Sequence, residues 1–518
     1  MNSTTYKSRL KNSKRNLVSG MLKQIVNIIL TFAVRTVILY ILGAEYQGLS
    51  GLFSSILQVL NLSELGFSSA VTFILYKPIA ENDTSSVCSI MAFLKKVYFA
   101  MGIVILVTGL ILMPFVPNLI SGGYPNTINI YILFLIYLIN TSVSYMLFAY
   151  KSTLLVAMQR DDIVSNIYTV TLIVSRFTQL VLLFLFKSYY CYVIVLPLCT
   201  IINNVLLEKA SRRVFPQIVP KGIISEEVKD EFVKQVKASL VNRVCDIARN
   251  SIDNIVLSSF MGLIAVAIYD NYFYIYAAVY GIMGIIVRAI QASIGNSLVR
   301  ENVDKNYYDC KRFTFMFMWV VGWCTICMSC LYQPFMKVWM RGNADLLLST
   351  LDMLLFCIYF YVISMTYTKG VYLEARGLYH ECRIWYILET IGNLGLNLIL
   401  GYYWGISGIL IATILTIIFI NFVSGTSILF KLYFKKSPCS FYLVHIKYGL
   451  VTVGVGLITY GICNCINMSG VSEVIVKGII CAILPNLMYL CLYHRTNIFK
   501  DSTDIIKHLV AKNSLGVK

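Results

Sequence analysis

About fourteen apolar stretches, each roughly 20 residues long, follow one another between Leu17 and Tyr493 with only short breaks. An α-helix of about 20 residues crosses a hydrocarbon core of about 30 Å. Because such helices use most of the 518 residues, little chain is left for a soluble domain. The sequence therefore predicts an all-α polytopic membrane protein, with spans at residues 17–41, 48–76, 92–116, 128–150, 163–186, 190–208, 241–261, 264–290, 313–335, 348–372, 384–401, 405–430, 447–463 and 473–493.

The distribution of basic residues predicts the orientation of these spans. Only 13% of the residues are charged, yet the net charge is +18. About 32 Lys and Arg fall in alternate loops and the two ends, against about three in the remaining loops, and basic loops stay in the cytoplasm. Both termini are therefore expected in the cytoplasm, which requires an even number of spans. The basic segment before Leu17 leads into a stretch longer than a signal-peptide core, so we expect it to remain as the first helix.

The longest break, residues 209–240, divides the chain. Ser225 is a candidate N-cap, and Val228, Phe232, Val236 and Leu240 recur every four residues after it. This pattern predicts an amphipathic helix on the inner membrane surface. The predicted organisation is an N-lobe of six helices (1–208), a cytoplasmic hinge (209–240), a C-lobe of six helices (241–436), two further helices (437–493) and a cytoplasmic tail (494–518).

An internal repeat relates the two lobes. Leu42-Gly43 closes the first span and Met261-Gly262 closes the seventh, at an offset of 219 (262 − 43). Short segments near Gln159 and Arg376 repeat at a similar offset. Each copy holds an even number of spans, so the copies should be parallel and related by a pseudo-two-fold axis along the membrane normal.

Polar residues at helical spacing interrupt the apolar pattern on matching helices. Lys23, Asn27 and Arg35 share one face of the first span, and the seventh span carries Asp246, Arg249 and Asp253. The second span adds Ser54, Gln58, Asn61, Glu64 and Ser68. Such stripes cannot face lipid, so they pack together or line a wet cavity. The predicted substrate-binding residues are Lys23, Asn27, Arg35, Arg176, Arg249 and Arg288, and the predicted ion-coupling residues are Glu64, Asp246 and Asp253.

Simpler interpretations stand beside these assignments. Arg249 could serve only as a helix clamp by pairing with Asp246 and Asp253. Lys23 and Arg35 can extend toward the two membrane surfaces, and Arg288 lies near a helix end. Arg176, in the middle of its span, has no such route. A stripe of Tyr269, Tyr272, Tyr276 and Tyr280 suits stacking on sugar rings, but packing is the favoured interpretation.

No enzyme motif is present, and no cofactor or metal is predicted. His380-Glu381-Cys382 lacks the second histidine of a zinc protease, and there is no phosphate-binding Gly-rich loop. Cys324, Cys327 and Cys330 have an iron–sulfur-like spacing, but they lie within an apolar helix, where such clusters are rare. Cys463 and Cys465 are candidates for a disulfide outside the membrane.

The chain resembles the polysaccharide transporters of the multidrug/oligosaccharidyl-lipid/polysaccharide (MOP) exporter superfamily, above all the O-antigen repeat-unit flippases. The resemblance lies in residues 39–48, in residues 62–67, and in Asn393-Leu394-Gly395-Leu396-Asn397 with the segment from Trp404 to Thr413. It implies two six-helix lobes around a cavity that opens alternately to each side of a bacterial cytoplasmic membrane. The implied substrate is an undecaprenyl-diphosphate-linked oligosaccharide for surface polysaccharide, with H⁺ or Na⁺ coupling and contacts to membrane lipids and other polysaccharide-assembly proteins.

Three rival functions remain. A multidrug or cation antiporter of the same superfamily would need an acidic cavity, and the excess of buried base opposes it. A membrane glycan polymerase or ligase would need catalytic external loops, which the sequence lacks. A non-transporting scaffold would have no use for the buried charges. Nucleic acid is not an expected partner.

Overall fold

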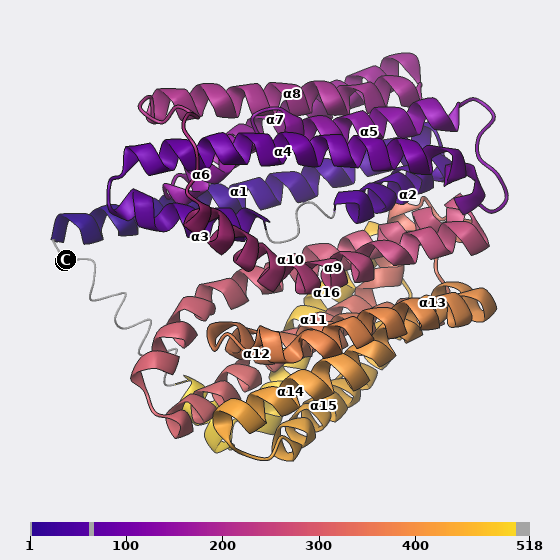
Figure 1. Cartoon of the computed structure of the whole chain (residues 1–518). Helices are drawn as coiled ribbons and strands as arrows, with labels where there is room; N and C mark the ends of the chain where they lie inside the picture. The colour runs from indigo at the N-terminus through magenta and orange to yellow at the C-terminus, as the bar shows by residue number, and fades with distance from the viewer. Residues whose placement is uncertain (1–2, 62–66, 504–518) are drawn as a thin grey trace. The chain divides into compact units, whose positions relative to one another are not determined.

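The computed structural model describes residues 3–61 and 67–503, which form helices throughout their length apart from short connections (Figure 1). The chain divides into two compact units, Met1–Ala267 and Ile268–Lys518, which we call the N-terminal and C-terminal units. An all-helical fold suits a bilayer because each helix satisfies its own backbone hydrogen bonds.

The N-terminal unit holds nine α-helices and a short 3₁₀ helix among its described residues. Their bounds are α1 (Ser3–Ile41), α2 (Ala44–Leu60), α3 (Phe67–Ala80), α4 (Thr84–Leu112), η2 (Met113–Leu119), α5 (Ile130–Met146), α6 (Tyr150–Ala157), α7 (Asp161–Phe186), α8 (Tyr189–Val214) and α9 (Glu226–Met261).

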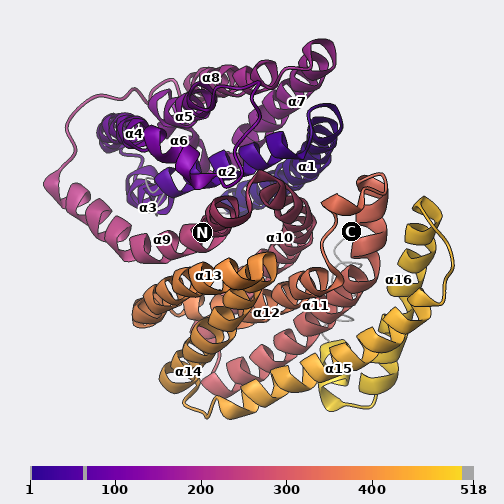
Figure 2. The ribbon, with the colours of Figure 1, turned by 90° about the vertical axis from the view of Figure 1, so that its right-hand side faces the viewer.

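Helices far apart in sequence pack together in this unit. α5 lies between α4 and α8, while α7 packs on both α1 and α8 (Figures 1 and 2). Leu133, Phe134 and Leu138 of α5 are fully buried, whereas Phe177 and Leu185 of α7 are exposed. Large apolar side chains on the outer face are what contact with lipid requires.

The C-terminal unit begins within α10 (Leu263–Arg300). Its other elements are α11 (Val303–Trp339), η3 (Ala344–Leu346), α12 (Thr350–Ala375), α13 (Tyr379–Thr416), the π-helix η4 (Ile417–Phe422), α14 (Val423–Leu429), the π-helix η5 (Phe430–Phe434), α15 (Cys439–Asn464) and α16 (Val471–Tyr493). α11 packs against α12 and also against α15 and α16 (Figure 2).

Ten helices of the described chain are long and apolar enough to cross a membrane, or eleven if the bent pair α5 and α6 makes one span. The multi-pass prediction is confirmed, whereas the arrangement of fourteen spans is not. Three features account for much of the difference. The span from His380 to Phe434 is 55 residues long and covers two predicted spans. α2 and α3, which are predicted as one span, are separate helices of 17 and 14 residues and are each too short to count as a span. α9, which contains the predicted seventh span, is too polar to count as one.

α9 joins two elements that the sequence pattern separates. It begins after Ser225, the predicted N-cap, and continues without interruption to Met261. Phe232 is buried and packs edge-on against Phe93 of α4 at 5.4 Å between ring centroids. The predicted surface helix is therefore the first part of a longer helix, and its apolar face covers protein. No Gly or Pro separates the two parts, so nothing in the sequence ends the helix at Leu240.

Backbone torsions repeat along the chain at the offset found in the sequence. Gly43 (φ 110°, ψ 173°) and Gly262 (φ 81°, ψ −175°) adopt the same glycine-specific conformation, 219 residues apart (262 − 43). Positive φ also recurs at the pairs Gly122 and Arg341, Gly123 and Gly342, Gln159 and Gly377, and Lys187 and Gly405. Their offsets are 219 (341 − 122 and 342 − 123) and 218 (377 − 159 and 405 − 187). The break at Gly405 inside α13 thus corresponds to the turn between α7 and α8.

Helix starts show the same correspondence. Asp83 caps α4 by accepting a hydrogen bond from the backbone N–H of Ser86 at 3.0 Å. Asn302, 219 residues later (302 − 83), caps α11 by accepting one from the N–H of Lys305 at 2.8 Å. The two halves therefore share turn chemistry as well as helix order.

Replacing Gly262 by alanine should destabilise the N-terminal unit more than the equivalent change at Gly43. Both positions adopt a glycine-specific conformation, which costs another residue about 1–3 kcal/mol. At Gly262 a Cβ would also lie 2.6 Å from the carbonyl oxygen of Ser121, while nothing lies within 4 Å of the corresponding position at Gly43. Overpacking adds about 1–3 kcal/mol. Thermal unfolding of the two variants in detergent measures the difference, and equal melting temperatures would contradict it.

Candidate functional site

A polar cavity of about 490 Å³ lies within the N-terminal unit. It is built between α2, α5, α7 and α8, so it lies inside one compact unit. The lining residues are Ser50, Ser54, Leu57, Gln58, Asn61, Tyr137, Asn140, Thr141, Arg176, Tyr192 and Leu196.

The wall contributed by α2 is the polar stripe predicted from the sequence. Ser50, Ser54 and Gln58 recur every four residues, which places them on one side of the helix. The opposite side of α2 is apolar, and Leu49, Leu52 and Phe53 are fully buried. Ser54, Gln58 and Asn61 therefore line a cavity, one of the two alternatives for a stripe that cannot face lipid.

Arg176 provides the positive charge of this cavity. Its Nη1 donates a hydrogen bond to Oε1 of Gln179 at 2.9 Å. Gln179 is fully buried, and its Nε2 donates to the carbonyl oxygen of Tyr192 at 3.2 Å, which fixes the amide orientation. The Nε atom of Arg176 is buried and has no hydrogen-bond partner among the described residues. One nitrogen of the guanidinium is thus held by Gln179, and the other N–H groups can donate hydrogen bonds to a ligand.

Hydroxyl and amide groups complete the cavity. The hydroxyl of Tyr137 donates to Oγ of Ser50 at 3.2 Å and lies 3.0 Å from the hydroxyl of Tyr189. Oδ1 of Asn140 accepts from Oγ1 of Thr200 at 2.7 Å, so its NH₂ group can donate elsewhere. Among the described residues no Asp or Glu lines the cavity. This set suits an anionic or polyhydroxylated ligand.

The predicted substrate-binding residues of α1, which are Lys23, Asn27 and Arg35, do not line this cavity. Lys23 places its Nζ over the ring of Tyr168 on α7, 4.7 Å from the centroid. Asn27 accepts a hydrogen bond from Oγ1 of Thr31 at 3.5 Å. Arg35 is half-buried. The cation–π contact ties α1 to α7, and the substrate-binding roles assigned to Lys23, Asn27 and Arg35 remain predictions.

Among the predicted residues beyond α8, only Arg249 and Asp253 have described side chains. Arg249 is half-buried and Asp253 is buried, both on α9. Glu64 lies outside the described residues, as do the side chains of Asp246 and Arg288. The roles assigned to these residues remain predictions.

Lys151 departs from its expected position. The sequence pattern places it in a cytoplasmic loop, but it lies on α6 and is only 1% exposed. Its Nζ is 3.6 Å from Oε2 of Glu208, whose Oε1 accepts from Nε of Arg212 at 2.5 Å. The chain bends by 47° between α5 and α6, and this bend carries Lys151 into the protein.

The C-terminal unit contains a buried network of charged and polar side chains to which the sequence pattern assigns no role. Nζ of Lys369 on α12 donates to Oδ1 of Asn421 at 2.6 Å, and Nδ2 of Asn421 donates to Oε2 of Glu389 on α13 at 2.7 Å. Lys369 and Glu389 are 3% and 2% exposed. Both charges are visible in the sequence, but Asn421 joins them from a π-helix that no sequence pattern indicates.

The motif near Asn393 forms a second polar network in this unit. Nδ2 of Asn393 donates to Oγ1 of Thr413 at 3.1 Å, and Nδ2 of Asn397 donates to Oδ1 of Asn393 at 3.2 Å. The bond from Asn393 to Thr413 connects the two arms of α13 on either side of the break at Gly405, and the bond from Asn397 orients Asn393 within the first arm. Asn393, Asn397 and Thr413, which belong to one of the segments that carry the family resemblance, are therefore buried and in contact.

The tyrosine stripe of α10 packs against other side chains, which is the interpretation that the sequence favours. Tyr269, Tyr272 and Tyr276 are at most 3% exposed, and Tyr276 stacks on Tyr359 at 4.8 Å. The hydroxyl of Tyr272 donates to Oε1 of Gln333 at 2.7 Å.

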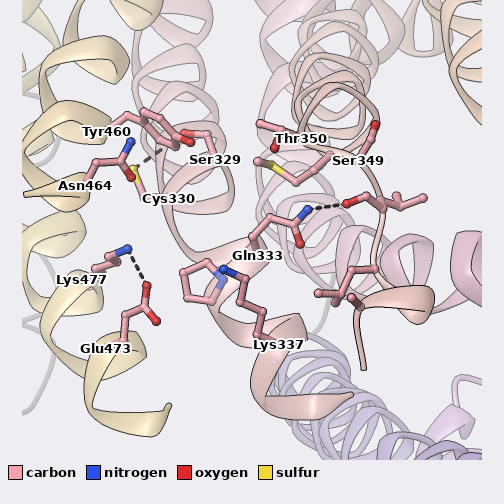
Figure 3. Close-up of a pocket in the computed structure, with 15 residues that line it drawn as sticks. Ser329, Cys330, Gln333, Lys337, Ser349, Thr350, Tyr460, Asn464, Glu473 and Lys477 are labelled. Atoms are coloured by element: carbon pink, nitrogen blue, oxygen red, sulfur yellow. Dashed lines mark hydrogen bonds and ion pairs between the residues drawn. The ribbon is translucent and has the colours of Figure 1, made fainter. Parts of the chain in front are cut away.

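A larger cavity, of about 620 Å³, lies in the C-terminal unit between α11, α12, α15 and α16. Figure 3 shows its polar lining, with Gln333 and Lys337 on one helix and Lys477 beside Glu473 on another. Nζ of Lys477 lies 2.6 Å from Oε1 of Glu473, so this charge is already paired. Lys337 is exposed. For these reasons we take the Arg176 cavity as the candidate substrate site.

The chain has the fold of the MOP superfamily of membrane transporters. A lipid II flippase, MurJ, in an inward closed conformation matches 92% of this chain and 98% of its own, with a TM-score of 0.68 at 16% identity. An inward-facing multidrug resistance MATE family transporter of the MOP superfamily matches 78% of this chain and 93% of its own (TM-score 0.56, 14% identity). A point mutant of the Vibrio cholerae MATE transporter VcmN matches 85% and 99% (TM-score 0.55, 14% identity). No protein-family model matches the sequence, and comparison with curated proteins yields no match.

Proposed function

We propose that this protein is a flippase that moves undecaprenyl-diphosphate-linked oligosaccharides from the inner to the outer leaflet by alternating access. The observation that carries the proposal is the Arg176 cavity. In it one positively charged side chain, held by a hydrogen bond to Gln179, lies among hydroxyl and amide groups. A diphosphate accepts charge-assisted hydrogen bonds from a guanidinium, and sugars exchange hydrogen bonds with hydroxyls and amides. The cavity matches both parts of such a head group.

Two classes of transporter occur among the structural neighbours, and the charge of the cavity favours one of them for this protein. A lipid II flippase and multidrug transporters share this fold. A cationic drug requires a negative group to compensate its charge in a low-dielectric site. The described lining of the cavity offers Arg176 and no carboxylate. A lipid-linked diphosphate is therefore the better match.

Energy coupling and orientation form part of the proposal. Asp253 is buried on α9 and, with Asp246 and Glu64, is assigned to H⁺ or Na⁺ coupling. The proposal assigns the basic loops, and with them both termini, to the cytoplasmic side of a bacterial membrane. The oligosaccharide then enters from the side on which it is synthesised and leaves for assembly into surface polysaccharide.

Transport by purified protein tests the proposal. The full chain is reconstituted in liposomes with a fluorescent prenyl-diphosphate oligosaccharide, and a membrane-impermeant quencher reports the fraction in each leaflet. Liposomes with protein should equilibrate the lipid across both leaflets, while empty liposomes should keep the label on one side. The same lipid without its diphosphate should move more slowly, because it lacks the group that binds Arg176.

Two results would contradict the proposal. One is accumulation of a cationic dye with no movement of the oligosaccharide lipid, which would indicate an antiporter. The other is a lengthened glycan on the lipid after incubation, which would indicate a polymerase or ligase.

A further inference from the structure

Three cysteines from three different helices meet inside the C-terminal unit. Cys330 lies on α11, Cys463 on α15 and Cys481 on α16. Their sulfur atoms all lie within 4.8 Å of one another, and the residues are 3%, 1% and 0% exposed. α11 is far from α15 and α16 in sequence, so the cluster exists only in the folded chain.

This arrangement differs from both cysteine arrangements that the sequence raises, neither of which the sequence favours. Cys324 and Cys327 line a separate apolar cavity of about 400 Å³, so the iron–sulfur-like run does not gather its three thiols at one point. Cys463 is buried, whereas its candidate disulfide partner Cys465 is exposed and both are free thiols. Cys330 and Cys463 instead share a new partner, Cys481.

The spacing of the sulfurs suits a shared metal ion. A metal–sulfur bond of about 2.3 Å places the ligand sulfurs of one ion roughly 4 Å apart. A small inward movement of the three side chains would reach this spacing. A disulfide would join only two of them and needs sulfurs about 2.05 Å apart.

Neighbouring groups hold the cluster in position. The backbone carbonyl of Cys481 accepts hydrogen bonds from Nε1 of Trp323 at 2.8 Å and from Sγ of Cys327 at 3.7 Å. Oγ of Ser329 lies 3.9 Å from Sγ of Cys330. Metal sites depend on such outer contacts to fix their ligands.

An ion can reach the cluster through the cavity of Figure 3. Cys330 is part of the lining of this cavity, together with Lys477 four residues before Cys481 on α16. The site therefore has an entry path.

We propose that Cys330, Cys463 and Cys481 bind a soft monovalent d¹⁰ cation, Cu(I), and so fasten α15 and α16 to α11. Thiolates select soft metals, and three sulfurs without a fourth ligand in the described cluster suit Cu(I) better than tetrahedral Zn²⁺. Each thiol that coordinates as a thiolate releases one proton into the cavity.

Cu(I) titration of the purified full chain tests the site. Under anaerobic conditions with ascorbate and a chromogenic Cu(I) chelator, the protein should retain one equivalent, and X-ray absorption should show sulfur ligands only. Cys330→Ser, Cys463→Ser and Cys481→Ser should each lower the affinity at least about tenfold. Cys465→Ser, two residues from Cys463 and exposed, is the matched control and should bind as the wild type does.

Thermal unfolding of the unmodified protein keeps the test independent of variant folding. Because Cu(I) should bind the cluster only in the folded chain, it should raise the melting temperature of the wild type. An unchanged melting temperature, full retention of the ion by the triple serine variant, or a disulfide between two of the three cysteines would each overturn the proposal.

Discussion

Arg176→Ala should lower the initial rate of oligosaccharide-lipid movement by roughly 10- to 100-fold. A hydrogen bond to a charged group contributes about 1.5–3 kcal/mol, and each 1.4 kcal/mol corresponds to about tenfold in rate. The guanidinium is the charged group of the cavity, and its hydrogen bond from Nη1 to Gln179 uses only one of its five N–H donors. Leaflet quenching in liposomes measures the rate, and substrate concentrations above and below half-saturation separate binding from turnover.

Two further substitutions make this result specific. Arg176→Lys keeps the charge but loses the planar fork of donors, so its rate should lie between those of the alanine variant and the wild type. Lys187→Gln removes a positive charge from the exposed end of the same helix and should transport normally. Wild-type rates in Arg176→Ala would exclude this cavity as the substrate site.

Glu389→Gln should reduce the free energy of unfolding of the C-terminal unit by about 3–5 kcal/mol, the range for breaking a buried charge pair. The change keeps the shape of the side chain but removes the negative charge that faces Lys369 through Asn421. An excess positive charge then remains inside the helix bundle. Titration with a denaturing detergent, followed by circular dichroism, measures the loss.

The double variant Lys369→Met/Glu389→Gln distinguishes a charge effect from a packing effect. Removing both charges leaves no excess charge, so the double variant should be more stable than Glu389→Gln alone. Glu381→Gln, on the exposed face of the same α13, should leave stability unchanged. Additive losses from the two single substitutions would show that the network carries no charge coupling.

Local sequence rules predicted much of the fold. Ser225 begins α9, and glycines at the ends of α1 and α9 adopt matched conformations because only glycine accepts them without strain. The bend between α5 and α6 was missed because Phe148 adopts positive φ without a Gly or Pro to indicate it. The sequence pattern consequently predicts a loop at Lys151, where the structure has the buried helix α6.

The candidate site was predictable only in part. Arg176 was singled out because an arginine in mid-span needs a polar environment, and the stripe on α2 was visible from its spacing. Their meeting depends on how α2, α5, α7 and α8 pack, which no local pattern encodes. The cysteine cluster and the contact of Asn421 with Lys369 are of the same kind, because each joins residues from separate helices.

The length of α10 and α11 has a practical consequence. α10 has 38 residues and α11 has 37, so each is roughly 55 Å long against a hydrocarbon layer of about 30 Å. Each helix is therefore long enough to extend beyond the hydrocarbon layer. The turn between the two helices, at residues 301–302, has exposed side chains. A peptide tag inserted there would report on which side of the membrane this turn lies, and a rigid domain fused there would give this small membrane protein a recognisable landmark for single-particle imaging.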